Sequence, residues 1–180
     1  GIDFYNIPTS LLAMVDASVG GKTGIDLGAL KNQIGIIQEP QGVIIAAEWL
    51  KTLAHEELRS GFAEMLKHGL IANPDYWETL KTISDLSAHN LEGFIKPSVA
   101  EKTKVVLEDP YEKGLRKILN FGHTLGHAIE SYYLTSPDKA RLLHGEAIAI
   151  GMVLEAFLAT KCSGLKDAVA AEIKHTFKSF

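Results

Sequence analysis

Two histidines, His123 and His127, stand four residues apart in the segment NFGHTLGHAIE. Apolar residues recur around them at helical spacing, so we expect a helix over 118–134 that carries both side chains on one face. Imidazole nitrogens are frequent ligands of zinc and other divalent metals. On spacing alone, the pair fits a metal site as well as it fits two partly buried histidines without a ligand.

A glutamate and a third histidine occupy two further segments with helical periodicity. Glu64 lies in the apolar stretch SGFAEMLKHG, where a buried carboxylate would need an ionic partner or a bound cation. Lys67, one turn later, offers a simple helical pair as the alternative. His144 begins the segment HGEAIAIGMV. One carboxylate and two histidines from three helices, with a fourth position open, match a catalytic zinc site. His68, four residues after Glu64, is a rival ligand that spacing does not exclude.

Two familiar motifs are nearly present, in three segments, but neither is complete. DASVGGKT differs from the phosphate loop GxxxxGK[ST] because Asp16 replaces the first glycine, and a carboxylate there would repel a phosphate. Lys22 therefore remains as a lysine on a tight glycine turn. The zinc-protease motif fails twice, since AHEELR has Arg59 in place of the second histidine and HTLGH has Thr124 in place of the glutamate.

Composition limits the class of protein. A hydrophobic content of 46%, a charged content of 22% and a net charge of −4 fit a globular protein and argue against a nucleic-acid partner. No apolar run reaches the roughly 20 residues of a membrane span, and the first residues lack a signal-peptide layout. The single cysteine, Cys162, excludes an internal disulfide. We expect a cytoplasmic protein with no membrane partner.

The hydrophobic pattern changes near residue 48. Before it, FYNIPTS predicts a strand, SLLAMVDAS a short helix capped by Ser10, GGKTGIDLGAL a loop or hairpin, and GVIIAA a six-residue buried strand. After it, apolar residues recur at intervals of three and four, which predicts five or six helices. The predicted fold is mainly α: a helical bundle over 48–180, preceded by a short mixed α/β segment over 1–47.

Six segments together resemble the 3-dehydroquinate synthase family: IPTSLLAMVDASVGGKTGID, LKNQIG, WLKTL, SGFAEMLKHGLI, LRKILNFGHTLGHAIE and LHGEAIAIGMV. The resemblance implies a dehydroquinate synthase-like bundle that uses NAD and a divalent metal, zinc or cobalt. It also implies a lyase of the shikimate pathway of aromatic amino acid biosynthesis. Such an enzyme converts the small anionic sugar phosphate 3-deoxy-D-arabino-heptulosonate 7-phosphate into 3-dehydroquinate and phosphate, and the full-length protein would be a homodimer.

The resemblance also implies roles for individual residues. The metal ligands would be Glu64, His123 and His144, while His127 would face the substrate phosphate or assist proton transfer. Cationic and polar side chains suit a substrate with a carboxylate and a phosphate. This catalytic set would comprise Lys22, Lys67, Lys102, Arg116 and Asn120, with Asp16, Asn32 and Glu112 nearby. The NAD contacts would be Thr9, Ser10, Lys22, Lys31, Trp49, Leu50, Lys51 and Thr52.

Two features depart from the family pattern. Its N-terminal nucleotide-binding α/β domain, with a glycine-rich phosphate turn, is expected to be absent, so residues 1–47 would complete only one wall of an NAD cleft. We therefore expect a chain that is a fragment or a natural half, with weak NAD binding and little turnover alone. His144 also follows His123 by twenty-one residues, a few more than in many members, which a surface loop can absorb.

Other classes of protein fit part of the pattern. Other sugar-phosphate cyclases act on substrates without the carboxylate. Lys102 and Arg116 together modestly favour a substrate that carries a carboxylate. Iron-dependent alcohol dehydrogenases share the architecture, but the lysine-rich set of anion-binding residues argues against that class. A non-catalytic helical module with a closed structural metal site would unfold when the metal is chelated.

Overall fold

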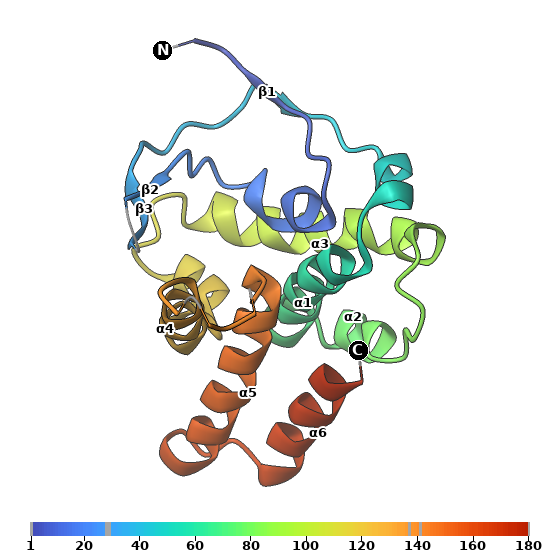
Figure 1. Cartoon of the computed structure of the whole chain (residues 1–180), viewed down its shortest axis with the longest axis vertical. Coiled ribbons are helices and arrows are strands. Elements are labelled where there is room, and N and C mark those ends of the chain that lie inside the picture. Colours follow the sequence, from blue (N-terminus) through green and yellow to red (C-terminus); the bar gives the residue numbers. More distant parts are fainter. Residues whose placement is uncertain (1, 28–29, 137, 141, 180) are drawn as a thin grey trace.

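Six α-helices form most of the chain that the computed structural model describes, residues 2–27, 30–136, 138–140 and 142–179 (Figure 1). They are α1 (His55–Ala72), α2 (Pro74–Leu80), α3 (Ala88–Glu108), α4 (His123–Leu134), α5 (His144–Cys162) and α6 (Asp167–Lys178). Three short turns accompany them: the π-helical η1 (Ala13–Ala17) and the 3₁₀ turns η2 (Ala47–Thr52) and η3 (Leu115–Asn120). The prediction of a mainly α fold is confirmed.

Helix α1 lies at the centre of the bundle. It contacts α2, α3, α5 and η1, and almost every residue from Leu58 to Gly69 is buried. The core around it contains Leu11, Met14, Phe62, Leu66 and Leu91. Because the helix is buried on all sides, its polar residues must find partners inside the protein.

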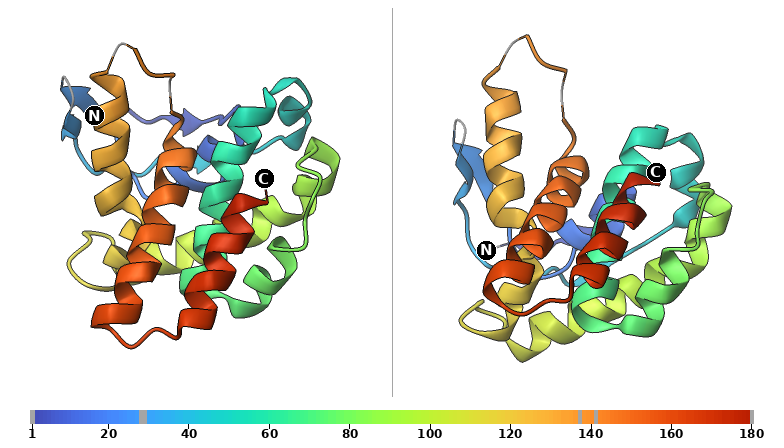
Figure 2. Two further views of the ribbon diagram at one scale, coloured as in Figure 1. Left: turned by 60° about the horizontal axis from the view of Figure 1, so that its bottom comes forward. Right: turned by 90° about the horizontal axis from the view of Figure 1, so that it is seen from below.

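Helices α4 and α5 pack closely because glycines line their interface. A side chain at Gly151 would collide with the carbonyl oxygen of Gly122, and one at Gly126 would press on Ile148. Helix α5 in turn lies between α4 and α6 (Figure 2). The close approach brings the first residue of α5, His144, beside α4.

The predicted helix over 118–134 is interrupted. Residues 115–120 form the turn η3, Gly122 adopts a φ of 80°, and α4 begins only at His123. A left-handed backbone is easy for glycine and ends a right-handed helix. The break places His123 in the first turn of α4, at the edge of a cavity.

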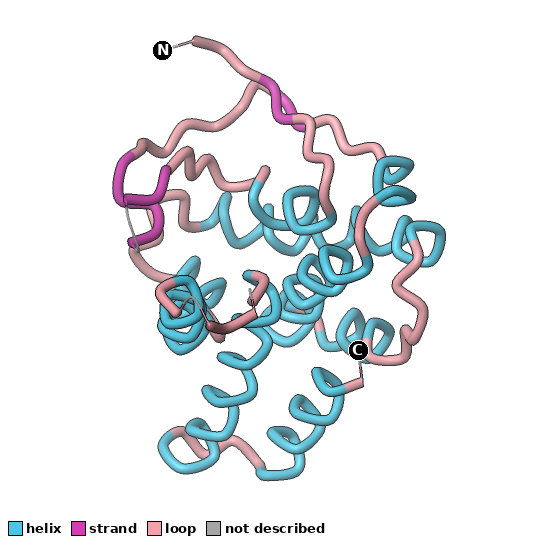
Figure 3. The backbone as a smooth tube through the Cα atoms, in the orientation of Figure 1, coloured by secondary structure: helices cyan, strands magenta, loops and turns pink. Residues whose placement is uncertain are grey.

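Strands occur only in the N-terminal part of the described chain (Figure 3). Strand β1 (Tyr5–Asn6) pairs in parallel with β4 (Gly42–Val43), and β2 (Ile25–Leu27) forms an antiparallel hairpin with β3 (Leu30–Ile34). The predicted strand, hairpin and Ser10 cap are confirmed; the hydroxyl of Ser10 accepts the backbone N–H of Ala13 at 3.3 Å.

The prediction of a buried six-residue strand over 42–47 was wrong. Strand β4 is two residues long, Ile44 is 55% exposed, and η2 begins at Ala47. Among the described residues only β1 pairs with β4, and the exposed side chain of Ile44 shows that the run is not covered on both faces as a buried parallel strand is. Among the described helices, none has an apolar stretch sufficient to cross a lipid bilayer.

Candidate metal and anion site

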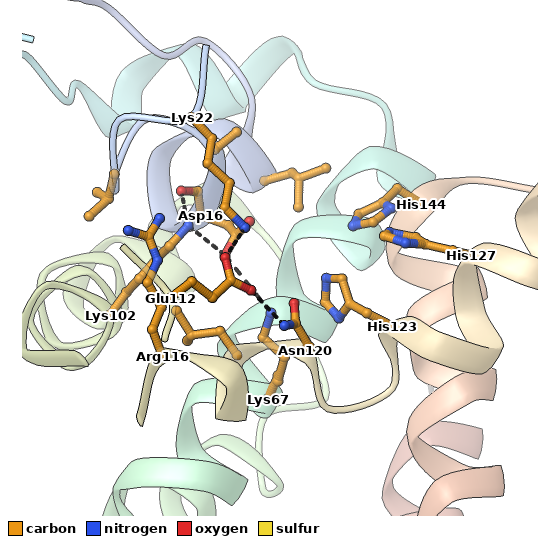
Figure 4. Close-up of a pocket in the computed structure, with 14 residues that line it drawn as sticks. Asp16, Lys22, Lys67, Lys102, Glu112, Arg116, Asn120, His123, His127 and His144 are labelled. Atoms are coloured by element: carbon orange, nitrogen blue, oxygen red, sulfur yellow. Dashed lines mark hydrogen bonds and ion pairs between the residues drawn. The ribbon is translucent and has the colours of Figure 1, made fainter. Parts of the chain in front are cut away.

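A cavity of ≈ 390 Å³ opens between η1, α3, η3 and the first turns of α4 and α5 (Figure 4). Most of the polar residues predicted from the sequence line it. They are Asp16, Lys22, Lys67, Lys102, Glu112, Arg116, Asn120, His123, His127 and His144. Segments nearly 130 residues apart in the sequence therefore contribute to one site.

Two of the predicted metal ligands, His123 and His144, approach one carboxylate oxygen of the third, Glu64. Oε1 of Glu64 lies 3.8 Å from Nε2 of His123 and 3.7 Å from Nε2 of His144. Ligand atoms of a tetrahedral zinc ion lie about 3.3 Å apart, so a small contraction would give a ligand set. Glu64 is fully buried, and no hydrogen-bond donor reaches its Oε1 among the described residues. A buried carboxylate oxygen between two imidazoles fits a divalent cation.

The third histidine lies close to the other two. The ring centroid of His127 is 5.2 Å from that of His123 and 5.8 Å from that of His144, and one nitrogen of each ring lies within 4.8 Å of the others. Geometry alone therefore admits His127 as a ligand or as a neighbour of the metal. The prediction that it faces the substrate stays a prediction.

His68, the rival ligand, points to a different side. Its Nδ1 lies 2.7 Å from the hydroxyl of Ser98, and its Nε2 lies 3.8 Å from Oδ1 of Asp16. One atom each of Asp16, Glu64 and His68 also lie within 4.8 Å of one another. Lys67 is paired with both carboxylates, and its positive charge disfavours a second cation there.

Two lysines and two carboxylates form a buried network. Lys67 pairs with Oε2 of Glu64 and lies 3.9 Å from Oδ1 of Asp16, while Lys102 lies 2.9 Å from the same oxygen and also donates to the Asp16 carbonyl. Burial opposes ionisation of Asp16, but Lys102 and then Lys67 outweigh it and hold its pKa well below its usual value. Burial likewise opposes the charge of Lys67, yet Glu64 and Asp16 raise its pKa. Lys67 in turn holds the pKa of Glu64 below its ordinary value despite burial, so Asp16, Glu64 and Lys67 are charged at neutral pH.

His123 is uncharged at neutral pH. Burial, followed by the nearby positive charge of Lys67, lowers the pKa of His123 to about 4. Its Nδ1 lies 3.2 Å from the carbonyl oxygen of Phe121, which accepts a hydrogen bond when Nδ1 is protonated. The lone pair then sits on Nε2, the nitrogen directed at Glu64, as metal binding requires.

The opposite wall of the cavity carries a second, more exposed ion pair. Nζ of Lys22 lies 2.6 Å from one oxygen of Glu112, and the side-chain amide of Asn120 donates to the other oxygen at 2.6 Å. The side chains of Lys22 and Glu112 are 48% and 23% exposed. Burial opposes ionisation of Glu112, but the hydrogen bonds from Lys22 and Asn120 outweigh it and lower its pKa. The Glu112 carboxylate thus already occupies the position at which Lys22 and Asn120 could bind another anion.

Arg116 joins two loops beside this pair. Its guanidinium donates to the carbonyl oxygens of Pro110 and Gly20, each at 2.8 Å, and the residue is only 2% exposed. Gly20 has a φ of 100°, and a side chain there would clash with the guanidinium. Arg116 therefore holds the glycine turn that carries Lys22, in addition to lining the cavity.

The predicted NAD residues are less well gathered. Of the described residues that line the cavity, Lys22 alone belongs to that set. Trp49, Lys51 and Thr52 are exposed on η2, whereas Leu50 is 1% exposed in the apolar core and has no side-chain surface to offer. Thr9 is exposed, and Ser10 caps the following helix. Lys31 and Asn32 belong to β3, and their side chains lie outside the described part of the structure.

The sequence did not predict two carboxylates beside this site, Glu130 and Asp109. Oε2 of Glu130 lies 3.5 Å from Nδ1 of His144, and Asp109 accepts backbone hydrogen bonds from Lys113, Gly114 and Arg116 at 2.6–3.1 Å. Glu130 follows His127 by three residues and so shares its helix face, which was a usable signal. Asp109 precedes Pro110 in a turn, where a side chain commonly accepts local backbone N–H groups.

The fold is that of the sugar phosphate cyclases. The chain superposes on a 2-deoxy-scyllo-inosose synthase complexed with carbaglucose-6-phosphate, NAD⁺ and Co²⁺, with a TM-score of 0.87 and 29% identity over 100% of this chain and 50% of that one. It also matches a 2-epi-5-epi-valiolone synthase from Streptomyces hygroscopicus with NAD⁺ and Zn²⁺ bound, with a TM-score of 0.81 and 26% identity over 98% and 49% of the two chains.

Sequence comparison narrows the class. The 3-dehydroquinate synthase N-terminal family model matches residues 1–60, and the 3-dehydroquinate synthase C-terminal model matches residues 61–180. The chain is 42% identical to the 3-dehydroquinate synthase of Parabacteroides distasonis, over 100% of this chain and 51% of that protein. It is 46% identical to the Streptococcus mutans enzyme over 85% and 43%. The chain belongs to the 3-dehydroquinate synthase family, and it spans about half the length of these relatives.

Proposed function

We propose that this chain provides the metal and substrate site of a 3-dehydroquinate synthase, which converts 3-deoxy-D-arabino-heptulosonate 7-phosphate into 3-dehydroquinate and phosphate. The observation that supports this most is the buried Glu64 oxygen between His123 and His144, at the edge of a cavity lined by cations. In this proposal residues 48–180 form the metal- and substrate-binding domain.

Glu64, His123 and His144 would hold the divalent metal, zinc or cobalt. A metal there supplies Lewis acidity, which lowers the pKa of a bound substrate hydroxyl. The neighbouring Lys67 stays positive and keeps Glu64 ionised, so the ligand set remains intact at neutral pH. His127 lies close enough to exchange a proton with a substrate group in the cavity, or to donate to its phosphate.

The remaining residues would bind and orient the anionic ends of the substrate. Lys22 and Asn120 already hold a carboxylate oxygen each, with the geometry of charge-assisted hydrogen bonds. Lys102 lies across the cavity, fixed by Asp16. Convergent cations of this kind would hold a substrate that carries both a phosphate and a carboxylate in one orientation. Holding a reactant in the reactive geometry lowers the barrier to reaction.

NAD is the cofactor that we propose for the whole enzyme, in which it supplies reversible hydride transfer. The residues predicted to contact it form no enclosed cavity in the described part of this chain, so we assign no step to them. For the same reason we propose that the 180-residue chain by itself turns over slowly or not at all. We further propose a homodimer as the assembly of the full-length enzyme.

Zinc titration of the metal-stripped chain by calorimetry tests the ligand assignment. We expect His123→Ala to abolish binding and His127→Ala to retain it. His68→Ala, which removes the rival histidine, should also retain it. Loss of binding with His127→Ala would show that three histidines share the metal, and absence of binding by the wild-type chain would contradict the proposed site.

A further inference from the structure

Glu130 is a buried carboxylate that the proposed ligand set does not use. It lies on α4, seven residues after His123 and three after His127, so all three side chains project from the same face of the helix. Only 6% of Glu130 is exposed. Its Oε2 lies 3.5 Å from Nδ1 of His144 on the facing helix α5.

The position of Glu130 follows from the close packing of α4 and α5. Gly126, one turn before Glu130, has no side chain to hold Ala147 and Ile148 of α5 away. The first turn of α5 can therefore approach α4, and His144 comes within reach of Glu130. Burial of a carboxylate is costly, so a carboxylate kept at such an interface needs a polar partner.

The two ring nitrogens of His144 face two different carboxylates. Nδ1 faces Glu130, and Nε2 faces Oε1 of Glu64 at 3.7 Å. His123 shows the same arrangement, since its Nδ1 faces the carbonyl oxygen of Phe121 at 3.2 Å and its Nε2 faces Glu64. Each imidazole thus has an oxygen acceptor at its Nδ1, and its Nε2 is directed at Oε1 of Glu64.

We propose that Glu130 is the positioning residue for His144: it accepts the Nδ1–H hydrogen bond and so directs Nε2 toward Glu64 and His123. This inference rests on the proposed metal site and adds a residue that is not itself a ligand. An acceptor at Nδ1 fixes the tautomer and the ring orientation of a ligating histidine, and a carboxylate acceptor also makes the imidazole a stronger donor to the metal.

Direct ligation by Glu130 is inconsistent with the geometry. Its carboxylate contacts the Nδ1 edge of the His144 ring, whereas the metal position indicated by Glu64 and His123 lies at the Nε2 edge. The ring therefore separates Glu130 from the metal. The remaining alternative is that Glu130 only stabilises the α4–α5 interface, and the experiment must separate that role from positioning.

The test compares zinc affinity in four forms of the chain, measured by competition with a chelating dye. We expect Glu130→Gln to bind zinc about tenfold more weakly than wild type and Glu130→Ala about a hundredfold more weakly, because loss of an outer-shell partner typically costs 10–100-fold. The glutamine retains an uncharged acceptor and should restore part of the affinity. Glu101→Gln is the matched control, since Glu101 on α3 is also a buried carboxylate (7% exposed) but accepts its hydrogen bond from Asn73, between α1 and α2, and not from a proposed metal ligand.

Two further measurements separate the positioning of His144 from a merely structural role of Glu130. The visible absorption of the cobalt-loaded chain should change with Glu130→Gln and remain unchanged with Glu101→Gln, because only the former alters a ligand's orientation. Thermal unfolding of the metal-free forms shows whether each variant folds. If both Glu130 variants fold and bind zinc as wild type does, or lose no more affinity than Glu101→Gln, the inference fails while the metal site stands. If wild type binds no zinc, the proposed site fails and the inference with it.

Discussion

The two walls of the cavity contain the same kind of ion pair in opposite surroundings. On the buried wall, Lys67 and Glu64 have side-chain exposures of 1% and 0%. On the loop wall, Lys22 and Glu112 have exposures of 48% and 23%. A lysine pairs with a glutamate in both cases, but only the second pair can exchange its partner for another anion without leaving a charge buried and unpaired.

This difference in exposure indicates that the two walls have different roles in the site. The buried wall, on α1 and η1, fixes charges whose arrangement must not change, including the carboxylate proposed as a metal ligand. The loop wall belongs to the glycine turn and the segment before α4, where polar groups remain accessible to a substrate. Exposed pairs contribute little to stability, so their loss should alter binding more than folding.

Removal of the buried lysine should produce the largest effect. Lys67→Met leaves Glu64 and Asp16 without their shared cation, and loss of one partner of a buried pair typically costs about 3–5 kcal/mol. The free energy of unfolding from chemical denaturation measures this in the metal-free chain. Added zinc should recover part of the loss, because the metal would then compensate Glu64.

Lys104→Met is the matched control for that prediction. Lys104 also pairs with a glutamate three residues earlier, Glu101, at 3.0 Å, but its side chain is 71% exposed. Its loss should cost less than about 1 kcal/mol. Equal costs for the two variants would show that burial does not distinguish the two kinds of pair.

The helix packing behind the histidines should be the next most sensitive feature. Gly151→Ala places a methyl group against the carbonyl oxygen of Gly122, and such overpacking costs about 1–3 kcal/mol. Because α4 must move away from α5, zinc affinity should fall as well, which calorimetry can measure. Gly93→Ala is the control: nothing lies within 4 Å of the new methyl group on α3, so stability should rise by about 0.5–1 kcal/mol. Unchanged zinc affinity in Gly151→Ala would show that the histidines do not depend on this contact.

The sequence was sufficient for most of the helices, although not for the break at Gly122 before α4, and for most polar residues that line the cavity. Apolar spacing identifies a helix such as α1, because its pattern is local. The gathering of Asp16, Lys67 and Lys102 was expected from family resemblance, and the structure places these side chains together.

What the sequence did not reveal depends on contacts between distant segments. The apolar run over 42–47 predicts a buried strand, yet its burial is decided by what covers it and not by its own residues. Leu50 appears beside Trp49 in the predicted cofactor segment, but η2 turns one side chain into the core and leaves the other exposed. Glu130 comes within reach of His144 only because α5 returns along α4.

Substitution of Glu112 should affect binding on the loop wall more than stability. Glu112→Gln removes the negative charge that competes with an incoming anion for Lys22 and Asn120. We expect inorganic phosphate to bind about tenfold more tightly, since a charge-assisted hydrogen bond is worth roughly 1.5–3 kcal/mol, while unfolding changes by less than about 1 kcal/mol. Calorimetric titration with phosphate measures the first quantity. Weaker binding would mean that Glu112 orients Lys22 for the anion, and Lys22→Met should weaken binding in either case.

The smallest effect should come from Asp109, which shapes the loop that carries Glu112. Hydrogen bonds from the backbone N–H groups of Lys113, Gly114 and Arg116 lower the pKa of Asp109 below its ordinary value of 3.8. A carboxyl group whose pKa is lower in the folded state stabilises the fold above the unfolded pKa, and that contribution is lost as the pH falls through the folded pKa. Asp109→Asn should therefore be less stable than wild type near neutral pH, and the two unfolding free energies should converge as the pH is lowered past 4. A difference that stays constant with pH would show that the charge of Asp109 does not hold the loop, and that the loop wall depends on Arg116 and its two carbonyl contacts instead.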